Sequence, residues 1–314
     1  MPDLTLILDR KELVVRMESK SIRIDRPDGL PERVPLKMID SVIVIGSPMV
    51  SCDVWRALAE HNISAVLFPS RGGGVSTYMS GGLSRTATTR IAQHRAACDP
   101  NTSLKVARWL LRKKLEGQEN VIEQLKNCRD LEPSSGPIRQ SRAKLNNATD
   151  RNSLMGIEGS AAAAYFGSFA KIIPPKWKFK GRNRRPPRDP VNALLSLGYV
   201  LAGSEVRRAI QSKGLDPAVG FLHSPQPGRE SLVLDILEPL RPEIDWFVLE
   251  LLDSPLNLRD FTTNDQDGCL LNKGGRGSFF KAWAEWGNPD AHTRRLTKMA
   301  DTIVQRLIEL FPTA

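Results

Sequence analysis

The hydrophobic pattern of this chain changes once, near residue 88, and that change constrains the fold more than any other feature. Before it, short β-branched or alternating runs are separated by turn residues such as Arg26-Pro27-Asp28-Gly29, a pattern typical of β-strands. After it, apolar residues recur with helical spacing. We therefore predict an α+β fold, with a small N-terminal β-rich domain (residues 1–85) followed by a larger all-helical domain (residues 86–314).

Turn and capping residues divide both parts into elements. The expected strands cover residues 4–8, 12–15, 21–24, 41–45 and 65–68, and the expected helices cover 53–61, 103–128, 153–173 and 189–213. Asp189-Pro190 supplies an N-cap and a first-turn proline for the last of these helices, and Gly214 ends it. We expect Pro239 and Pro242 to break the next helix before residues 244–252 continue. Asn288-Pro289 is expected to start a final helix that reaches about Leu310.

The positive charge is confined to the C-terminal part. The chain has a net charge of +10, yet residues 1–82 contain ten Lys or Arg and ten Asp or Glu. The remainder therefore carries the whole excess, which favours a polyanionic partner such as DNA for that part.

Several classes of protein are excluded by what the sequence lacks. No run of about 18 apolar residues predicts a membrane span, and the first residues do not resemble a signal peptide. The four cysteines show no CxxC spacing, so we expect buried, reduced thiols. No G-x-S-x-G or G-x-G-x-x-G motif is present. We expect a cytoplasmic protein.

A histidine and two acids follow one another closely in the C-terminal part. His223 lies in a turn bounded by Gly220 and Gly228, and Asp235 and Glu238 follow at a spacing that places them on one helical face. Separately, they are ordinarily a structural histidine and a solvated acidic face. Together they favour a site for Mg²⁺ or Mn²⁺, because these ions prefer oxygen donors with some histidine.

Glu158 is a further candidate because of its neighbours. It lies in the segment Met155-Gly156-Ile157-Glu158-Gly159-Ser160-Ala161, whose small side chains leave the helix surface bare. Another backbone or a substrate can approach closely there. The alternatives are tight helix packing and an exposed glutamate without a role.

The densest basic segment covers residues 174–188. Its cations are interleaved with Trp177 and Phe179, which predicts binding of DNA phosphates together with stacking on bases. A solvated linker is the alternative. The cations are Lys176, Lys178, Lys180, Arg182, Arg184, Arg185 and Arg188.

Four ordered motifs resemble one family. They are E-G at 158–159, N-R-x-x-R-P-P-x-D-P-V-N-A-L-L-S-L-G-Y at 183–199, G-F-L-H-x-x-x-x-G-R-x-S-L at 220–232 and D-x-x-E-P-x-R-P at 235–242. Their combination resembles the CRISPR-associated adaptation integrases, the Cas1 family. The resemblance implies a β domain that forms a homodimer and a helical catalytic domain. It further implies that Glu158, His223 and Glu238 bind the metal with Asp235 beside them, and it leaves open which of Asp235 and Glu238 ligates directly.

The same resemblance implies the activity and the partners. Family members act in spacer acquisition as divalent-metal-dependent endonucleases and integrases, which join the 3′-hydroxyl of captured DNA to the CRISPR repeat by transesterification. A second adaptation protein bridges two dimers. The basic segment, with Arg229 and Arg241, is expected to hold the DNA backbone. A general metal-dependent nuclease for branched DNA and a catalytically silent DNA-capture scaffold remain as alternatives.

Overall fold

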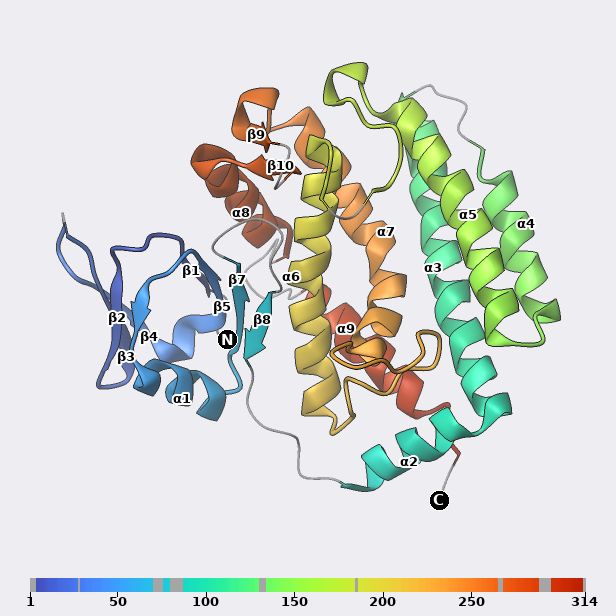
Figure 1. The fold of residues 1–314 in the computed structure, drawn as a ribbon, viewed down its shortest axis with the longest axis horizontal. Coiled ribbons are helices and arrows are strands. Elements are labelled where there is room, and N and C mark those ends of the chain that lie inside the picture. The colour runs from blue at the N-terminus through green and yellow to red at the C-terminus, as the bar shows by residue number, and fades with distance from the viewer. Residues whose placement is uncertain are drawn as a thin grey trace.

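The structure is a computed structural model, and it describes residues 4–27, 29–69, 76–79, 87–129 (backbone only for 127–129), 134–183, 186–264, 268–287 and 295–312. The glycine-rich segments 71–74 and 80–82, whose composition is typical of turns, lie outside these ranges, as do the helix start at Asn288-Pro289 and the boundary between residues 85 and 86. Figure 1 shows the β-rich part on one side and the helices on the other.

Two four-stranded sheets form the N-terminal part. The strands are β1 (Leu4–Leu8), β2 (Val14–Glu18), β3 (Ser21–Asp25), β4 (Glu32–Pro35), β5 (Ile39–Ile45), β6 (Met49–Val50), β7 (Ser64–Phe68) and β8 (Thr77–Met79), with helix α1 (Cys52–Glu60) before β7. One sheet has the order β1-β5-β7-β8, parallel except for β8, and the other has the order β4-β3-β2-β6. The predicted strands are confirmed, with ends that shift by one to three residues.

Strand β5 shows why this region reads as one continuous apolar run. Val42 and Val44 lie in the core of the β-rich part, whereas Ile43 lies in the core of the helical part. Successive side chains of a strand point to opposite faces. The sheet is therefore buried on both faces, and it joins the β-rich part to the helices.

The C-terminal part is built mainly of helices, as predicted. They are α2 (Ala87–Cys98), α3 (Pro100–Arg129), α4 (Gly136–Lys144), α5 (Arg151–Ile172), α6 (Pro190–Ser212), α7 (Ser231–Asp253), α8 (Lys273–Gly287) and α9 (Arg295–Ile308). Asp189 caps α6 by accepting a hydrogen bond from the Asn192 amide, as its position predicts. Helix α7 lies between α3 and α6 in the centre (Figure 1).

The predicted break at Pro239 and Pro242 is wrong, because α7 continues through both prolines. A proline costs a helix one backbone hydrogen bond and about 3 kcal/mol. Here both prolines are buried, and the Pro242 ring packs where Gly117 of α3 has no side chain: a Cβ on Gly117 would lie 2.8 Å from its Cγ. Packing against α3 and α6 offsets the local cost.

The helical part also contains a small two-stranded sheet that the sequence pattern did not predict. Strands β9 (Phe261–Asn264) and β10 (Gly268–Leu271) pair in antiparallel fashion. The Cys269 amide donates to the Pro187 carbonyl over 2.7 Å, and a Cβ on Gly268 would overlap that carbonyl. The β9–β10 hairpin thus fixes the C-terminal end of the basic segment (residues 174–188). The alternative of a freely moving, solvated linker is therefore wrong for that end.

Two further predictions concern membrane-spanning helices and the state of the cysteines, and the structure is compared with them over the residues that it describes. Within it, no helix is long and apolar enough to cross a bilayer. The cysteines with described side chains are free thiols, as expected, but only Cys269 is buried, whereas Cys52 and Cys98 are exposed.

Candidate active site

The loop before α7 is built around Asp235. This fully buried carboxylate accepts hydrogen bonds from the backbone amides of Phe221, Leu222 and His223 at 2.5, 2.9 and 2.8 Å. Its Oδ1 also lies 2.6 Å from His223 Nδ1. A Cβ on Gly220 would lie 2.8 Å from Asp235 Oδ2, which explains the glycine at that position. Asp235 therefore orients the imidazole and leaves Nε2 as its free nitrogen.

Glu158 and Glu238 meet at one lysine. The Nζ of Lys114, on α3, forms an ion pair with Oε1 of Glu158 on α5 and with Oε2 of Glu238 on α7, the latter at 2.6 Å. Only 6% of the Lys114 side chain is exposed. Three helices that are distant in sequence thus bring two carboxylates to one cationic atom.

The carboxyl group of Glu238 is buried, and nearby positive charges stabilise its ionised form. Burial by itself raises the pKa of its carboxyl, but the positive charges of Arg241, Lys114 and His223 lower it more, so the pKa falls to about 2. The Arg241 Nε lies 3.1 Å from Oε1 of Glu238. The structure thus pairs His223 with Asp235 and, through Lys114, brings Glu158 together with Glu238.

The donor set fits a divalent ion in chemistry but not in its present arrangement. Two carboxylates and an imidazole with one fixed nitrogen are suitable ligands for Mg²⁺ or Mn²⁺. Oε2 of Glu238 is buried, and its contact in the structure is the ion pair with Lys114 Nζ at 2.6 Å. However, no three acidic, histidine or cysteine side chains in the described ranges lie close enough to share an ion. Lys114 occupies the place between the carboxylates.

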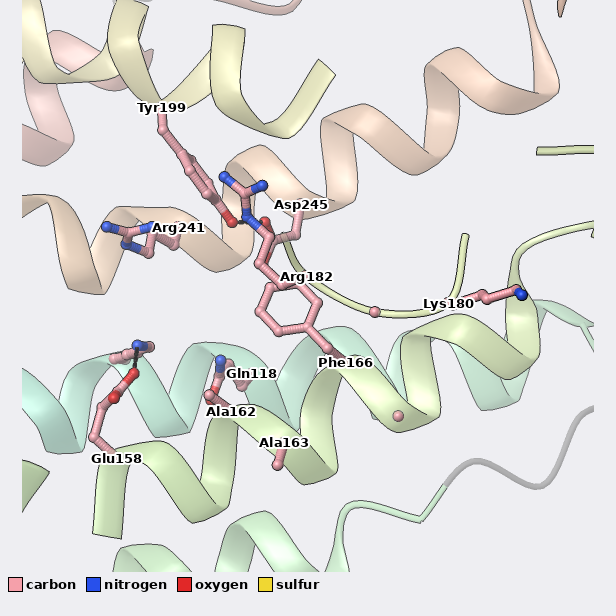
Figure 2. A pocket seen from close by; sticks show the side chains of 13 residues that line it. Gln118, Glu158, Ala162, Ala163, Phe166, Lys180, Arg182, Tyr199, Arg241 and Asp245 are labelled. Carbon is pink, nitrogen blue, oxygen red and sulfur yellow. Dashed lines mark hydrogen bonds and ion pairs between the residues drawn. The ribbon is translucent and has the colours of Figure 1, made fainter. Parts of the chain in front are cut away.

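A cleft of about 390 Å³ opens beside Glu158. Figure 2 shows Glu158 at one end and Lys180 at the other, with Arg182, Tyr199 and Asp245 above α5. Its floor is formed by small residues of α5, including Ala162, Ala163 and Gly167. A Cβ on Gly156, Gly159 or Gly167 would meet nothing among the described neighbours within 4 Å. The small residues therefore border open space, not a packed helix.

Aromatic and charged side chains form the wall opposite α5. The Tyr199 hydroxyl donates a hydrogen bond to Asp245, and the guanidinium of Arg241 lies 4.5 Å from the centroid of the Tyr199 ring. Burial raises the pKa of the Asp245 carboxyl to about 6. The guanidinium of Arg182 lies on the same ring at 5.4 Å and donates to Asn192 and Ser196. This network holds two arginines next to the cleft.

The predicted cations divide into three groups. Lys180, Arg182 and Arg241 line the cleft. Lys176, Lys178 and Arg188 are exposed outside it, and Arg229 donates to the Ser224 carbonyl of the histidine loop. Arg184 and Arg185 lie outside the described residues.

Base stacking on Trp177 and Phe179 is contradicted by their burial. Trp177 is 0% exposed and Phe179 is 8% exposed, and both belong to the helical core. The alternating order Lys-Trp-Lys-Phe-Lys turns the rings inward and the three lysines outward. The aromatic residues anchor the segment, and only the cations remain available to DNA.

We did not predict from the sequence that Lys114 and Gln118 belong to the site. Both lie on the apolar side of α3, one helical turn apart and on the same face as Leu111 and Leu115. Polar residues are not expected on the apolar face of a helix. Gln118 is buried, and its Oε1 accepts no hydrogen bond from the described residues. Two polar positions within an apolar stripe were the signal that could have identified them.

Both the sequence and the fold of this chain match known proteins. Residues 6–285 match the family described as CRISPR associated protein Cas1. A CRISPR-associated endonuclease Cas1 of Thermodesulfovibrio yellowstonii is 32% identical over 95% of this chain and 99% of its own. A casposase bound to integration product has a TM-score of 0.87 at 23% identity, covering 100% of this chain and 92% of its own.

A Cas6-RT-Cas1–Cas2 complex gives a TM-score of 0.80 at 21% identity over 99% of this chain and 36% of the other. At such identities these structural likenesses establish the fold alone. The family match spans most of the chain and includes all four ordered motifs. The relative from Thermodesulfovibrio yellowstonii aligns with this chain over 99% of its own length. The chain belongs to the Cas1 family of CRISPR-associated proteins.

Proposed function

We propose that this site joins the 3′-hydroxyl of a captured DNA fragment to a CRISPR repeat, with Mg²⁺ or Mn²⁺ held by Glu158, His223 and Glu238. The observation that carries the proposal is the meeting of carboxylates from α5 and α7 at Lys114 Nζ, together with an imidazole that is oriented by Asp235, one helical turn before Glu238 on α7. When bound, the ion would act as a Lewis acid on the reacting phosphate.

The reaction needs no external energy source. The 3′-oxygen of the fragment forms a bond to the phosphorus at the 5′ end of the repeat, while the bond from that phosphorus to the 3′-oxygen of the adjoining nucleotide breaks, so the number of phosphodiester bonds is unchanged. With water as the nucleophile, the same site would cut without joining. The open face of α5 admits a strand, and Lys180, Arg182 and Arg241 border its path. Positioning and charge neutralisation would supply most of the rate.

Glu238, not Asp235, is the direct ligand in this proposal. Asp235 already accepts three backbone hydrogen bonds and contacts His223 Nδ1, so its oxygens are occupied. The oxygens of Glu238 are instead paired with the side chains of Lys114 and Arg241, which can move away more easily than backbone amides. Carboxylates that hold a ligating histidine in this way tune the site without touching the metal.

The partners in this proposal are double-stranded DNA, a second copy of the chain and a second adaptation protein that bridges two dimers. The related structures include a casposase bound to an integration product and a complex that contains Cas2, which supports DNA and a protein partner. Free thiols agree with a cytoplasmic location. For the homodimer, support comes from exposed apolar residues of the β-rich part, among them Leu30 and Met49. Sedimentation of the purified chain as a monomer would contradict the dimer.

The decisive experiment mixes the protein and its Cas2-type partner with a short labelled DNA and a supercoiled plasmid that carries a repeat. Covalent joining of the label at the repeat edge, dependent on Mn²⁺ and abolished by chelation, is the expected result. Cleavage of branched DNA without joining would instead indicate the general nuclease. Binding without either reaction would indicate a DNA-capture scaffold.

Lys180 provides a test of the proposed DNA path. Because it is exposed at the end of the cleft, Lys180→Ala should weaken DNA binding for all sequences and reduce the salt slope, d log K/d log[salt], by about one. Lys171→Ala, an exposed lysine of α5 outside the cleft, is the matched control. Fluorescence anisotropy between 50 and 200 mM salt (about the range over which phosphate contacts are most visible) measures both. Equal slopes for the two variants would remove Lys180 from the DNA path.

A further inference from the structure

Lys114 is an unusual residue for a metal site because it brings a positive charge to the ligands. Its stem lies in the core of α3 beside Leu111 and Leu115, and its ammonium group contacts both Glu158 and Glu238. In the described part of the chain it is the only cation paired with Glu158, whereas Glu238 is also paired with Arg241. The lysine is thus the single charge that joins the two carboxylates.

An ammonium group and a divalent ion cannot both lie between these oxygens. Like charges a few Å apart repel strongly where water is largely excluded, and the side chains of Lys114 and Glu238 are nearly buried. Without any cation, the two carboxylates would repel each other for the same reason. The position therefore needs one cation at a time.

We propose that Lys114 is a positioning residue that occupies the metal's place in the metal-free protein and withdraws when the ion binds. This inference rests on the proposed function, because it takes Glu158 and Glu238 as ligands. In the metal-free state the lysine keeps the carboxylates close together. Metal binding is then an exchange of one cation for another, and Lys114 lowers the affinity for the ion.

The adjoining cleft offers the displaced ammonium group a destination. Lys114 and Gln118 both line it next to Glu158, and Gln118 presents an amide oxygen that has no hydrogen bond in the described structure. The aliphatic stem of lysine is long and flexible, so the ammonium group can move from the two carboxylates into the adjoining cleft. In the cleft the ammonium group would face a DNA phosphate, which links metal binding to DNA binding.

The first test compares Mn²⁺ affinity of Lys114→Met and the unaltered chain, measured by electron paramagnetic resonance of free Mn²⁺ without DNA. Loss of the competing charge should tighten binding by about 5- to 150-fold, the usual range for coupled sites. Lys113→Met is the matched control, since Lys113 is exposed on the same helix and pairs with Glu116. Unchanged or weaker Mn²⁺ binding in Lys114→Met would overturn the inference.

The second test uses the unaltered protein and does not depend on a variant that folds. Amine acetylation read by mass spectrometry should be slow at the buried Lys114 without metal and should increase when Mn²⁺ is added, with Lys113 as an internal reference. Equal or lower labelling of Lys114 with Mn²⁺ would contradict its withdrawal.

His223→Ala separates this inference from the proposed function. If Mn²⁺ binds to the unaltered chain and His223→Ala abolishes binding, the metal site is established, and the behaviour of Lys114 is judged alone. If the unaltered chain binds no Mn²⁺, or binds it equally without His223, the proposed ligand set is itself wrong.

Discussion

Glu238→Gln is expected to abolish both joining and cleavage while the chain remains folded. Glutamine has nearly the same shape but cannot carry the negative charge that holds a divalent ion. The loss should exceed the roughly 10- to 100-fold that removal of a group behind a ligand costs. Glu158→Gln and His223→Ala should behave alike, because all three contribute to one site.

The control for this prediction is Glu250→Gln on the same helix. Glu250 is exposed and accepts a hydrogen bond from Trp246, so its replacement should leave the rate of joining unchanged. Circular dichroism verifies folding of each variant, and Mn²⁺ affinity separates loss of the ion from loss of chemistry. Joining by Glu238→Gln within tenfold of the unaltered chain (about 1.4 kcal/mol in the barrier) would eliminate Glu238 as a ligand.

The pKa of Glu238 adds an independent readout of the same residue. The pKa is lowered from 4.5 to about 2 in the folded state, so the stability that its ion pairs contribute is present above pH 4.5 and is lost as the pH falls toward 2. The free energy of unfolding of Glu238→Gln should lack this loss, whereas Glu250→Gln should retain it. Urea unfolding at several pH values makes the comparison.

Asp235→Ala is expected to have the second large effect, and mainly on stability. The substitution leaves two buried backbone amides, the half-buried amide of His223 and His223 Nδ1 without their acceptor. Each unsatisfied buried group costs about 1–3 kcal/mol, so the loss of unfolding free energy should be at least about 3 kcal/mol. Asp301→Asn, which alters a partly exposed ion pair with Arg208 at 3.5 Å, should change it by less than about 1 kcal/mol.

Asp235→Asn separates a positioning role from ligation. An asparagine retains one acceptor but turns an NH₂ group toward backbone amides that also donate, so the loop and His223 should shift. We expect Mn²⁺ affinity and joining to fall by about 10- to 100-fold without disappearing. Complete loss of Mn²⁺ binding in a folded Asp235→Asn protein would identify Asp235 as a direct ligand. Full retention of activity would show that His223 does not depend on it.

Local signals predicted most of the elements because their causes are local. Alternating apolar residues define β3, a continuous apolar run defines β5, and Asp189-Pro190 and Gly214 set the ends of α6 within the chain segment itself. One failure concerns α7, where two prolines predicted a break. Its continuity depends on packing against α3, and in particular on Gly117, which lies more than a hundred residues earlier.

The residue types of the site were visible in the sequence, and its arrangement was not. The motifs identified Glu158, His223, Asp235 and Glu238 but not the contacts that these side chains make. In the basic segment, the sequence predicted base stacking on Trp177, which the burial of that side chain excludes. By itself the sequence determined the order of strands and helices, the location of the excess charge and the acids and histidine of the site. Only the tertiary structure decided that Asp235 serves the loop and that Lys114 joins Glu158 to Glu238. Those contacts link α3, α5 and α7, and no short-range pattern encodes which buried faces will meet.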